Sequence, residues 1–428
     1  MTVMRFKKAV EGDGMKRIAR TLLAIIVTSF AIAAHAETST LTVGAFPFID
    51  QIIKAAIPGW KKLHPDVDIK ILSREYIDHH EAMMAQLAAD SVQIDVMAVE
   101  LDYLGQFTES GGLEDLTKVP YSGPLYRKKF VDYTFPLAMN SRGQLIAIPT
   151  DVGPGTLFYR KDILEKAGVT EADLTESWES FIESGKKIKA ATGTFLLANA
   201  SNIKDIVIRS NLGDGEGIYF DKAKNVIVDR PRFVKAFTLA KAVRDGKLDL
   251  KLTVWSKEWT EGFKRGMVAT QMMGAWMGRN LANYAPASKG LWRATDLPND
   301  AYSFWGGTFY AIPKKSKNKE MAWEFIKFMT MNKSNQLEAF KTQDAFPALL
   351  EAQIDPFFDQ PVEFLGGAKV RVMWRNAARK IPAIDISKHD PMAAAIINTE
   401  LDKVLDQGKD IKTALADAKA LIEARMRP

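Results

Sequence analysis

The amino-terminal third of the chain alternates between short strand-like runs and longer amphipathic runs with the apolar spacing of a helix. We expect Asp78 to cap the second helix, with Glu81 completing a capping box. This strand–helix–strand–helix–strand order is typical of a parallel sheet covered by helices, and so predicts an α/β fold. The five segments are residues 40–46, 49–65, 66–76, 78–90 and 93–100.

Ligands of open α/β sheets bind beyond the carboxyl ends of the strands. The loops after Val43, Ile71 and Val99 are therefore where a binding site is expected. The candidate residues in these loops are Phe46, Phe48, Tyr76, Glu100, Asp102 and Tyr103.

A dense cluster of glycine and proline interrupts the pattern at Asp151–Gly155. It lies between two predicted strands, residues 145–149 and 156–160, so it could absorb a change of backbone direction. Two interpretations are open, a surface loop or a crossing between domains, and the composition favours the crossing.

A second α/β region follows, and the chain ends in two amphipathic helices. Predicted strands here are residues 194–200, 268–273 and 308–313, of which the last could recross to the first domain. Predicted helices are residues 177–192, 231–248, 318–330, 391–407 and 411–426.

The segment before Glu37 has the organisation of a secretory signal. A short basic stretch from Met15 precedes the apolar run of residues 22–34, and Ala34-His35-Ala36 fits a cleavage site. We expect residues 1–36 to be removed, Met15 to be the true start and the mature chain to begin near Glu37. A retained amino-terminal anchor is the alternative.

Removal of this leader changes the net charge. The whole chain has 58 Lys and Arg against 52 Asp and Glu, a net charge of +6. The leader carries six of the cations and two of the acids, so the mature chain has 52 against 50, or +2. Charge therefore gives no reason to expect binding to nucleic acid or to a membrane surface.

Several kinds of chemistry are excluded or unsupported. The chain has no cysteine, which excludes disulfides, thiol catalysis and cysteine-bound metals. His79-His80-Glu81 is the sole cluster of histidine and acid, and its adjacent residues do not converge as metal ligands at i and i+4 do, so no metal is expected. No nucleotide-binding or nucleophile motif is present, and the acidic Gly213–Gly217 segment is interpreted as a loop. A pair of glycosidase carboxylates stays open, because acids are abundant.

Four tryptophans, by contrast, lie beside residues that break secondary structure: Trp255, Trp276, Trp305 and Trp374. A single tryptophan usually belongs to the core. Four at the ends of elements favour a second interpretation, because sugar rings pack their C–H faces on aromatic rings and need polar groups around them. Trp305 is followed by Gly306-Gly307, which would allow the backbone to approach a ligand.

At the level of whole segments the chain resembles the bacterial extracellular solute-binding proteins of the sugar-binding family 1, the maltose-binding-protein-like receptors of ABC importers. The resemblance covers nearly all of the mature chain, and its pieces occur in the family order. Departures are Arg160 where the family usually has Asn, Ser177 in place of Thr, and Val268 in place of Ala. The resembling segments are residues 87–117, 145–169, 177–188, 263–276, 305–329 and 364–382.

The resemblance implies a two-lobed periplasmic binding protein of the type II, Venus-flytrap class, with a hinge between the lobes. The implied amino-terminal lobe is residues 37–151 with 309–341, and the carboxyl-terminal lobe is residues 152–308 with 342–428. The implied hinge residues are Asp151, Gly153, Gly307 and Tyr310.

The same resemblance implies ligand-binding residues on both sides of the interlobe space. These are Phe46, Phe48, Tyr76, Glu100, Asp102, Gly155, Thr156, Trp255, Trp276, Trp305, Gly306, Arg371 and Arg375. The last two arginines keep an anionic sugar derivative open as the ligand.

The implied function is that of a periplasmic receptor, without catalysis, cofactor or metal. It would act as a monomer, bind a sugar or sugar derivative, and deliver it to an ABC permease driven by a separate ATPase. Alternatives are a receptor of the same fold for a non-sugar or anionic solute, and an exported glycan-degrading enzyme.

Overall fold

The computed structural model describes residues 39–89, 92–213 and 215–427. The predicted leader, residues 1–36, lies outside these ranges. Within them, no helix combines the length and the apolar character that a membrane crossing requires.

The first lobe is built on a five-stranded sheet, in the order β2-β1-β3-β8-β4. β1 pairs in parallel with both β2 and β3, which confirms the predicted parallel unit. β8 enters from a distant part of the sequence and pairs antiparallel with β3 and β4. The strands are β1 (Ser39–Ala45), β2 (Val67–Ser73), β3 (Val96–Glu100), β4 (Ala147–Pro149) and β8 (Thr308–Ala311).

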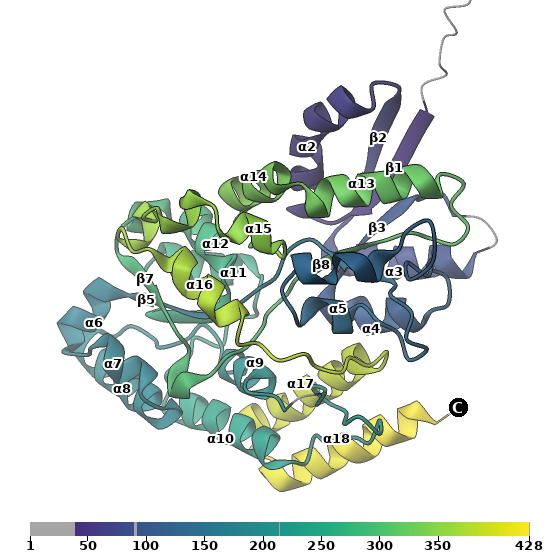
Figure 1. The fold of residues 1–428 in the computed structure, drawn as a ribbon. Coiled ribbons are helices and arrows are strands. Elements are labelled where there is room, and N and C mark those ends of the chain that lie inside the picture. Colours follow the sequence, from purple (N-terminus) through teal and green to yellow (C-terminus); the bar gives the residue numbers. More distant parts are fainter. Residues whose placement is uncertain (1–38, 90–91, 214, 428) are drawn as a thin grey trace, which may run out of the picture.

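Helices cover this sheet (Figure 1). Trp60 of α2 is fully buried and packs edge-on against Phe325 and Phe328 of α13, which joins two helices far apart in sequence. The predicted cap at Asp78 is wrong, because α3 begins at Tyr76 and Asp78 lies in its first turn. The elements are α2 (Ile49–Leu63), α3 (Tyr76–Ala88), α4 (Leu101–Glu109), the 3-10 helix η1 (Gly123–Lys129), α5 (Thr134–Leu137), α13 (Lys319–Met331) and α14 (Lys333–Gln343).

The second lobe is built on a three-stranded antiparallel sheet, in the order β6-β5-β7. The strand predicted at residues 194–200 is instead irregular, with isolated bridges from Phe195 to Val268 and from Leu197 to Asp249. The strands are β5 (Gly155–Arg160), β6 (Thr270–Gly274) and β7 (Trp292–Thr295), and the helical elements are α6 (Lys161–Ala167), α7 (Glu171–Thr175), α8 (Trp178–Thr192), α9 (Ser201–Arg209), α10 (Pro231–Asp245), α11 (Lys257–Lys264), α12 (Met277–Tyr284), η2 (Pro286–Ser288) and η3 (Pro298–Asp300).

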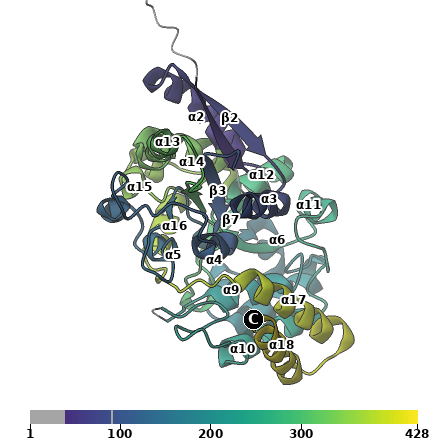
Figure 2. The same ribbon diagram turned by 90° about the vertical axis from the view of Figure 1, so that its right-hand side faces the viewer.

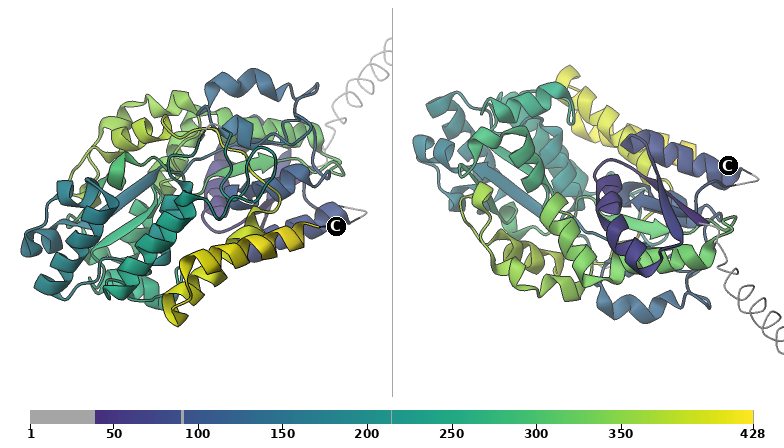
Figure 3. Two further views of the ribbon diagram at one scale, coloured as in Figure 1. Left: turned by 90° about the horizontal axis from the view of Figure 1, so that it is seen from below. Right: turned by 90° about the horizontal axis from the view of Figure 1, so that it is seen from above.

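The carboxyl-terminal segment completes the second lobe. α16 packs on β5 and β7, and α17 and α18 pack on each other and on α10 (Figures 2 and 3). Trp374 of α16 is buried, 6.4 Å from Phe158 between ring centroids, so of the two interpretations given for the tryptophans it fits core packing. The elements are α15 (Leu350–Gln353), η4 (Pro356–Asp359), η5 (Glu363–Leu365), α16 (Val370–Ala378), α17 (Asp390–Gln407) and α18 (Ile411–Met426).

Three segments that join the two sheets lie together. Asp151 bridges to Pro347, and its carboxylate accepts a hydrogen bond from the Thr308 backbone N–H at 3.0 Å. Pro154 bridges to Phe304. The segment around Asp151, the segment before Thr308 and the segment around Pro347 thus form one connection, although the lobe boundaries given above stay predictions.

Candidate functional site

Glu100 ends β3 and is the central polar residue on the first-lobe side. Its Oε2 accepts a hydrogen bond from the Tyr76 hydroxyl at 2.6 Å and one from the Asp102 backbone N–H at 2.7 Å. Tyr76 reaches it because α3 begins at that residue, directly beyond the end of β2. Burial, together with the neighbouring charge of Asp102, raises the pKa of Glu100 to about 8.

His80 fixes the backbone beside this carboxyl group. The Glu100 backbone N–H donates to His80 Nε2 at 3.0 Å, so the proton is on Nδ1, which donates to the Tyr76 carbonyl at 2.7 Å. Burial lowers the pKa of His80 to about 3, so the ring stays neutral. No group of three or more potential metal ligands occurs within residues 39–89, 92–213 and 215–427. His80 thus positions β3 and α3 against each other.

Aromatic rings surround this corner of the first lobe. Phe46 packs edge-on against Tyr76, with ring centroids 5.6 Å apart, and Tyr103 stacks on His80 at 4.1 Å. Phe48 is exposed and adopts a positive φ of 74° at the start of α2. The predicted residues Phe46, Tyr76 and Glu100 therefore lie together.

Three tryptophans form the second-lobe side. The Trp276 indole donates from Nε1 to the Trp305 carbonyl at 2.9 Å. Trp255 stacks on Trp276 with ring centroids 5.8 Å apart and planes 24° apart. Trp255 is 54% exposed and has a φ of 71°, a conformation that is strained for a large side chain. An exposed and strained tryptophan is not explained by core packing.

Gly306 lies between the two sides. A Cβ atom added there would be 3.3 Å from Trp276 Nε1 and 3.4 Å from Glu100 Oε1, and its φ of 79° is left-handed. Trp305, the residue before it, donates its backbone N–H to the Gly153 carbonyl at 2.7 Å. The backbone at Gly306 therefore lies against both the Trp276 indole and the Glu100 carboxyl group.

Arg209, at the end of α9, was not predicted and joins the two lobes directly. It donates from Nη2 to Asp102 Oδ1 at 3.3 Å, and its guanidinium lies 5.3 Å from the Trp305 ring centroid. Asp205, in the same helix, is 3.6 Å from Nη1. The sequence signal was a cation at the end of an otherwise apolar run, Ile206 to Ile208. We call Tyr76, Glu100, Asp102, Arg209, Trp255, Trp276, Trp305 and Gly306 the interlobe cluster.

Two further groups near the Arg209–Asp102 pair were also missed. Burial raises the pKa of Tyr219, and the neighbouring charge of Arg209 opposes this rise. Burial raises the pKa of Asp390 to about 7, and Asp102 adds to this rise. Neither residue belongs to a recognisable motif, so the sequence alone could not have identified them.

The other predicted contacts lie within strands or in the connection. Thr156 is fully buried in β5 and donates to the Pro154 carbonyl at 3.1 Å, while Gly155 pairs with Gly274. Gly307 has a φ of 141°, and Tyr310 lies inside β8. Their roles in binding or hinge motion stay predictions.

Arg371 and Arg375 have partners elsewhere. Arg371 lies 3.9 Å from the Phe357 ring centroid and donates to the Gln360 carbonyl at 3.0 Å. Arg375 donates to the Gln353 carbonyl at 3.1 Å. These contacts join α16 to α15 and η4, and none of them involves the interlobe cluster.

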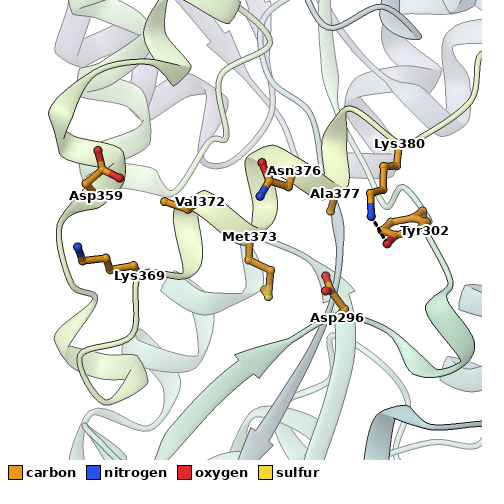
Figure 4. Close-up of a pocket in the computed structure, with 9 residues that line it drawn as sticks. All are labelled: Asp296, Tyr302, Asp359, Lys369, Val372, Met373, Asn376, Ala377 and Lys380. Atoms are coloured by element: carbon orange, nitrogen blue, oxygen red, sulfur yellow. Dashed lines mark hydrogen bonds between the residues drawn. The ribbon is translucent and has the colours of Figure 1, made fainter. Parts of the chain in front are cut away.

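A separate groove of about 560 Å³ runs along the outer face of α16 (Figure 4). Met373 of α16 extends toward Asp296, and Lys380 bonds to the Tyr302 hydroxyl at one end (Figure 4). None of the predicted ligand-binding residues lines it.

Comparison with known proteins identifies relatives over most of the chain. The family model described as bacterial extracellular solute-binding protein matches residues 56–365. A lactose-binding protein of Rhizobium radiobacter is 27% identical over 388 residues, which are 87% of this chain and 89% of the relative. An arabinooligosaccharide-binding protein of Bacillus subtilis is 28% identical over 298 residues, 65% of this chain and 66% of the relative.

Solved structures match the fold. An extracellular solute-binding protein of family 1 superposes with a TM-score of 0.78 at 22% identity, covering 90% of this chain and 99% of that one. Maltose-bound MalE3 of T. maritima gives a TM-score of 0.75 at 20% identity, covering 91% and 100%. The two-lobed α/β fold class is thereby confirmed.

Proposed function

Because the chain belongs to the bacterial extracellular solute-binding proteins, we propose that it is the sugar-binding receptor of an ABC importer. Its ligand is a sugar, an oligosaccharide or a neutral sugar derivative, held between the lobes at the interlobe cluster. Relatives named for lactose and for arabinooligosaccharides support this ligand class.

The observation that carries the proposal is the junction at Gly306, which has the Trp276 indole on one side and the buried Glu100 carboxyl group on the other. Indole faces suit the C–H face of a pyranose, and Glu100 and Asp102 can bond its hydroxyls. Trp255 offers an exposed ring beside Trp276, so the aromatic surface is wider than one indole.

A neutral ligand fits the charges of the cluster. Its guanidinium, Arg209, is already paired with Asp102 and Asp205. Arg371 and Arg375, which kept an anionic ligand open, bond backbone carbonyls around α16. An anionic sugar would therefore have to compete with existing carboxylates for Arg209.

Binding would be coupled to closure of the lobes about the connection at Asp151 and Gly307. A ligand that touches both lobes interacts more favourably with the closed form and so increases its population. The Arg209–Asp102 contact would form only when the lobes are closed.

Outside the cytoplasmic membrane, the closed receptor would dock as a monomer on a permease driven by a separate ATPase. We propose that residues 1–36 direct export to the periplasm and are removed. The family consists of binding proteins, and we propose that this chain likewise carries out no catalysis and needs no cofactor or metal.

Isothermal titration calorimetry with lactose, maltose, β-1,6-galactobiose and an arabinooligosaccharide tests the proposal, together with tryptophan fluorescence. We expect saturable binding of at least one sugar, weakened at least tenfold by Trp276→Ala. Trp323→Phe, on α13 of the first lobe, is the matched control and should leave binding unchanged. Absence of binding across the panel by the wild-type protein would contradict the proposal.

A further inference from the structure

The two most exposed large aliphatic side chains of the described residues lie close together in sequence. Val119, which precedes the 3-10 helix η1, is 85% exposed, and Leu125, inside η1, is 82% exposed. The blue segment that contains η1 projects from one edge of the molecule in both views of Figure 3. Exposed apolar side chains at a projecting edge are available to a partner.

Cations lie close to these two side chains in the sequence. Residues 117–129 carry four cations, Lys118, Arg127, Lys128 and Lys129, and no acid. Lys118 is paired with Asp115 at 3.5 Å, whereas no ion pair between described residues includes Arg127, Lys128 or Lys129. The nearest acid beyond the segment on the carboxyl side is Asp132. Residues 117–129 therefore carry a net charge of +4, although the mature chain is nearly neutral.

The segment is held firmly by its buried residues. Tyr121 and Tyr126 pack on Trp323 of α13, with ring centroids 5.7 Å and 6.1 Å apart. Phe130, fully buried, bridges to Leu349. Val119 and Leu125 are thus presented on a fixed support, which lowers the entropy lost when they are buried by a partner.

A run of similar composition at the end of α2 differs from residues 117–129 in its ion pairs. Lys61-Lys62-Leu63 also combines cations with an exposed leucine. There, however, Lys61 is paired with Asp68 and donates to the Pro65 carbonyl. Composition alone does not distinguish the two runs, but their ion pairs do.

We propose that residues 117–129 form a docking surface for an anionic phospholipid bilayer. The cations would bind the lipid phosphates, and Val119 and Leu125 would enter the headgroup layer, as in interfacial basic and apolar segments. Bound there, the receptor would be concentrated at the membrane in which its permease is expected. This inference concerns a surface of the first lobe distinct from the interlobe cluster and goes beyond sugar binding.

Flotation of the mature chain with vesicles tests the inference. Vesicles of phosphatidylcholine with ~30 mol% phosphatidylglycerol, an anionic phospholipid, are compared with vesicles of pure phosphatidylcholine. We expect at least fivefold more protein on the anionic vesicles at low salt, and a loss of this difference at high salt, where the charges are screened.

Three variants make the test specific. Lys118→Gln/Arg127→Gln/Lys128→Gln/Lys129→Gln should abolish the anionic preference, and Val119→Ser/Leu125→Ser should reduce binding at least threefold. Lys61→Gln/Lys62→Gln/Leu63→Ser is the matched control and should leave binding to anionic vesicles unchanged. Sugar affinity and melting temperature, unchanged in all three, would show that the fold is intact.

Two results would overturn the inference. One is equal binding of the wild-type protein to neutral and anionic vesicles. The other is loss of binding to purified permease, but not to vesicles, in the fourfold glutamine variant, which would assign the surface to an acidic protein instead. Neither result would affect the calorimetric test of sugar binding.

Discussion

Arg209 of α9 and Asp102 of α4 belong to opposite lobes, yet their side chains meet at 3.3 Å. Because Asp102 is half-exposed, the pair is worth about 0.5–1 kcal/mol. Asp102→Asn should therefore shift the ligand-free protein two- to fivefold toward the open form. Small-angle scattering should show a larger radius of gyration without sugar.

Asp68→Asn is the control for this prediction, because its ion pair with Lys61 lies within the first lobe. It should leave the radius of gyration unchanged. An unchanged radius in Asp102→Asn would mean that the pair does not influence closure.

Trp255 should lower the stability of the fold while strengthening sugar binding. Its φ of 71° is left-handed, so Trp255→Gly should relieve strain and raise the unfolding free energy by roughly 0.5–1 kcal/mol. The same change removes an exposed ring beside Trp276 and should weaken sugar binding about tenfold, or ~1.4 kcal/mol. Calorimetry and chemical denaturation measure the two effects separately.

Lys251→Gly is matched to this variant, since Lys251 is also exposed and has a φ of 58°. It should raise stability and leave sugar affinity as it is. Equal loss of affinity in both variants would point to a general loosening of the second lobe instead.

Glu100 should make stability depend on pH. Its pKa is about 8 in the fold, raised by burial, and near 4.5 in an unfolded chain, so the folded state holds one more proton between these values. Stability should fall as pH rises through this window, by up to about 1.4 kcal/mol per pH unit. Glu100→Gln keeps both hydrogen-bond donors, Tyr76 and the Asp102 N–H, and should flatten the slope.

Denaturation at several pH values between 5 and 9 measures the slope. Asp390, with a pKa of about 7 raised by burial, has the same sign and remains in the variant. The relevant quantity is therefore the difference between wild-type and variant slopes. An identical slope in both would show that Glu100 is ionised throughout this range.

Gly105 should limit how closely the lobes approach. It lies inside α4, and a Cβ atom there would be 2.5 Å from the Ser387 carbonyl oxygen, in the segment that leads to α17. Alanine is the better helix former by about 1 kcal/mol, so Gly105→Ala should not harm the first lobe itself. It should instead weaken sugar binding at least fivefold by hindering closure.

Calorimetry of Gly105→Ala against Gly59→Ala checks this prediction. An added Cβ at Gly59, in α2, would meet only the Phe328 ring, at 3.3 Å, within the first lobe. Its sugar affinity should be unchanged. Unchanged affinity in Gly105→Ala would show that the contact with Ser387 adjusts freely.

Local patterns predicted the fold well and the site in part. The alternation and apolar content of the sequence located β1 to β3. The rule that ligands bind beyond the carboxyl ends of the strands pointed to Glu100 and Tyr76. The start of α3 was misplaced because Asp78 is a good cap by type, whereas the chain turns earlier to bring Tyr76 against Glu100. Residues 194–200 have the composition of a strand but form only isolated bridges.

Contacts between distant segments were beyond sequence reasoning. Arg209 and Asp102 are 107 positions apart, and no periodicity links them. The resemblance implied ligand contacts at Arg371 and Arg375, which stay predictions, and the partners these arginines have here depend on where η4 and α15 pack. Trp374 likewise lies in the core because α16 covers β5, a packing of distant segments that its sequence neighbours do not reveal.

The central place of β8 has a consequence for biosynthesis. β4 pairs with β8, and β8 follows residues 152–307, the first and larger part of the second lobe, in the sequence. A nascent chain therefore has β3 and β4 unjoined until β8 has been made, and such non-local pairing is slow to form. Late closure of this sheet favours a chain that is still unfolded when translation ends, the form in which a secreted protein is threaded through a translocon.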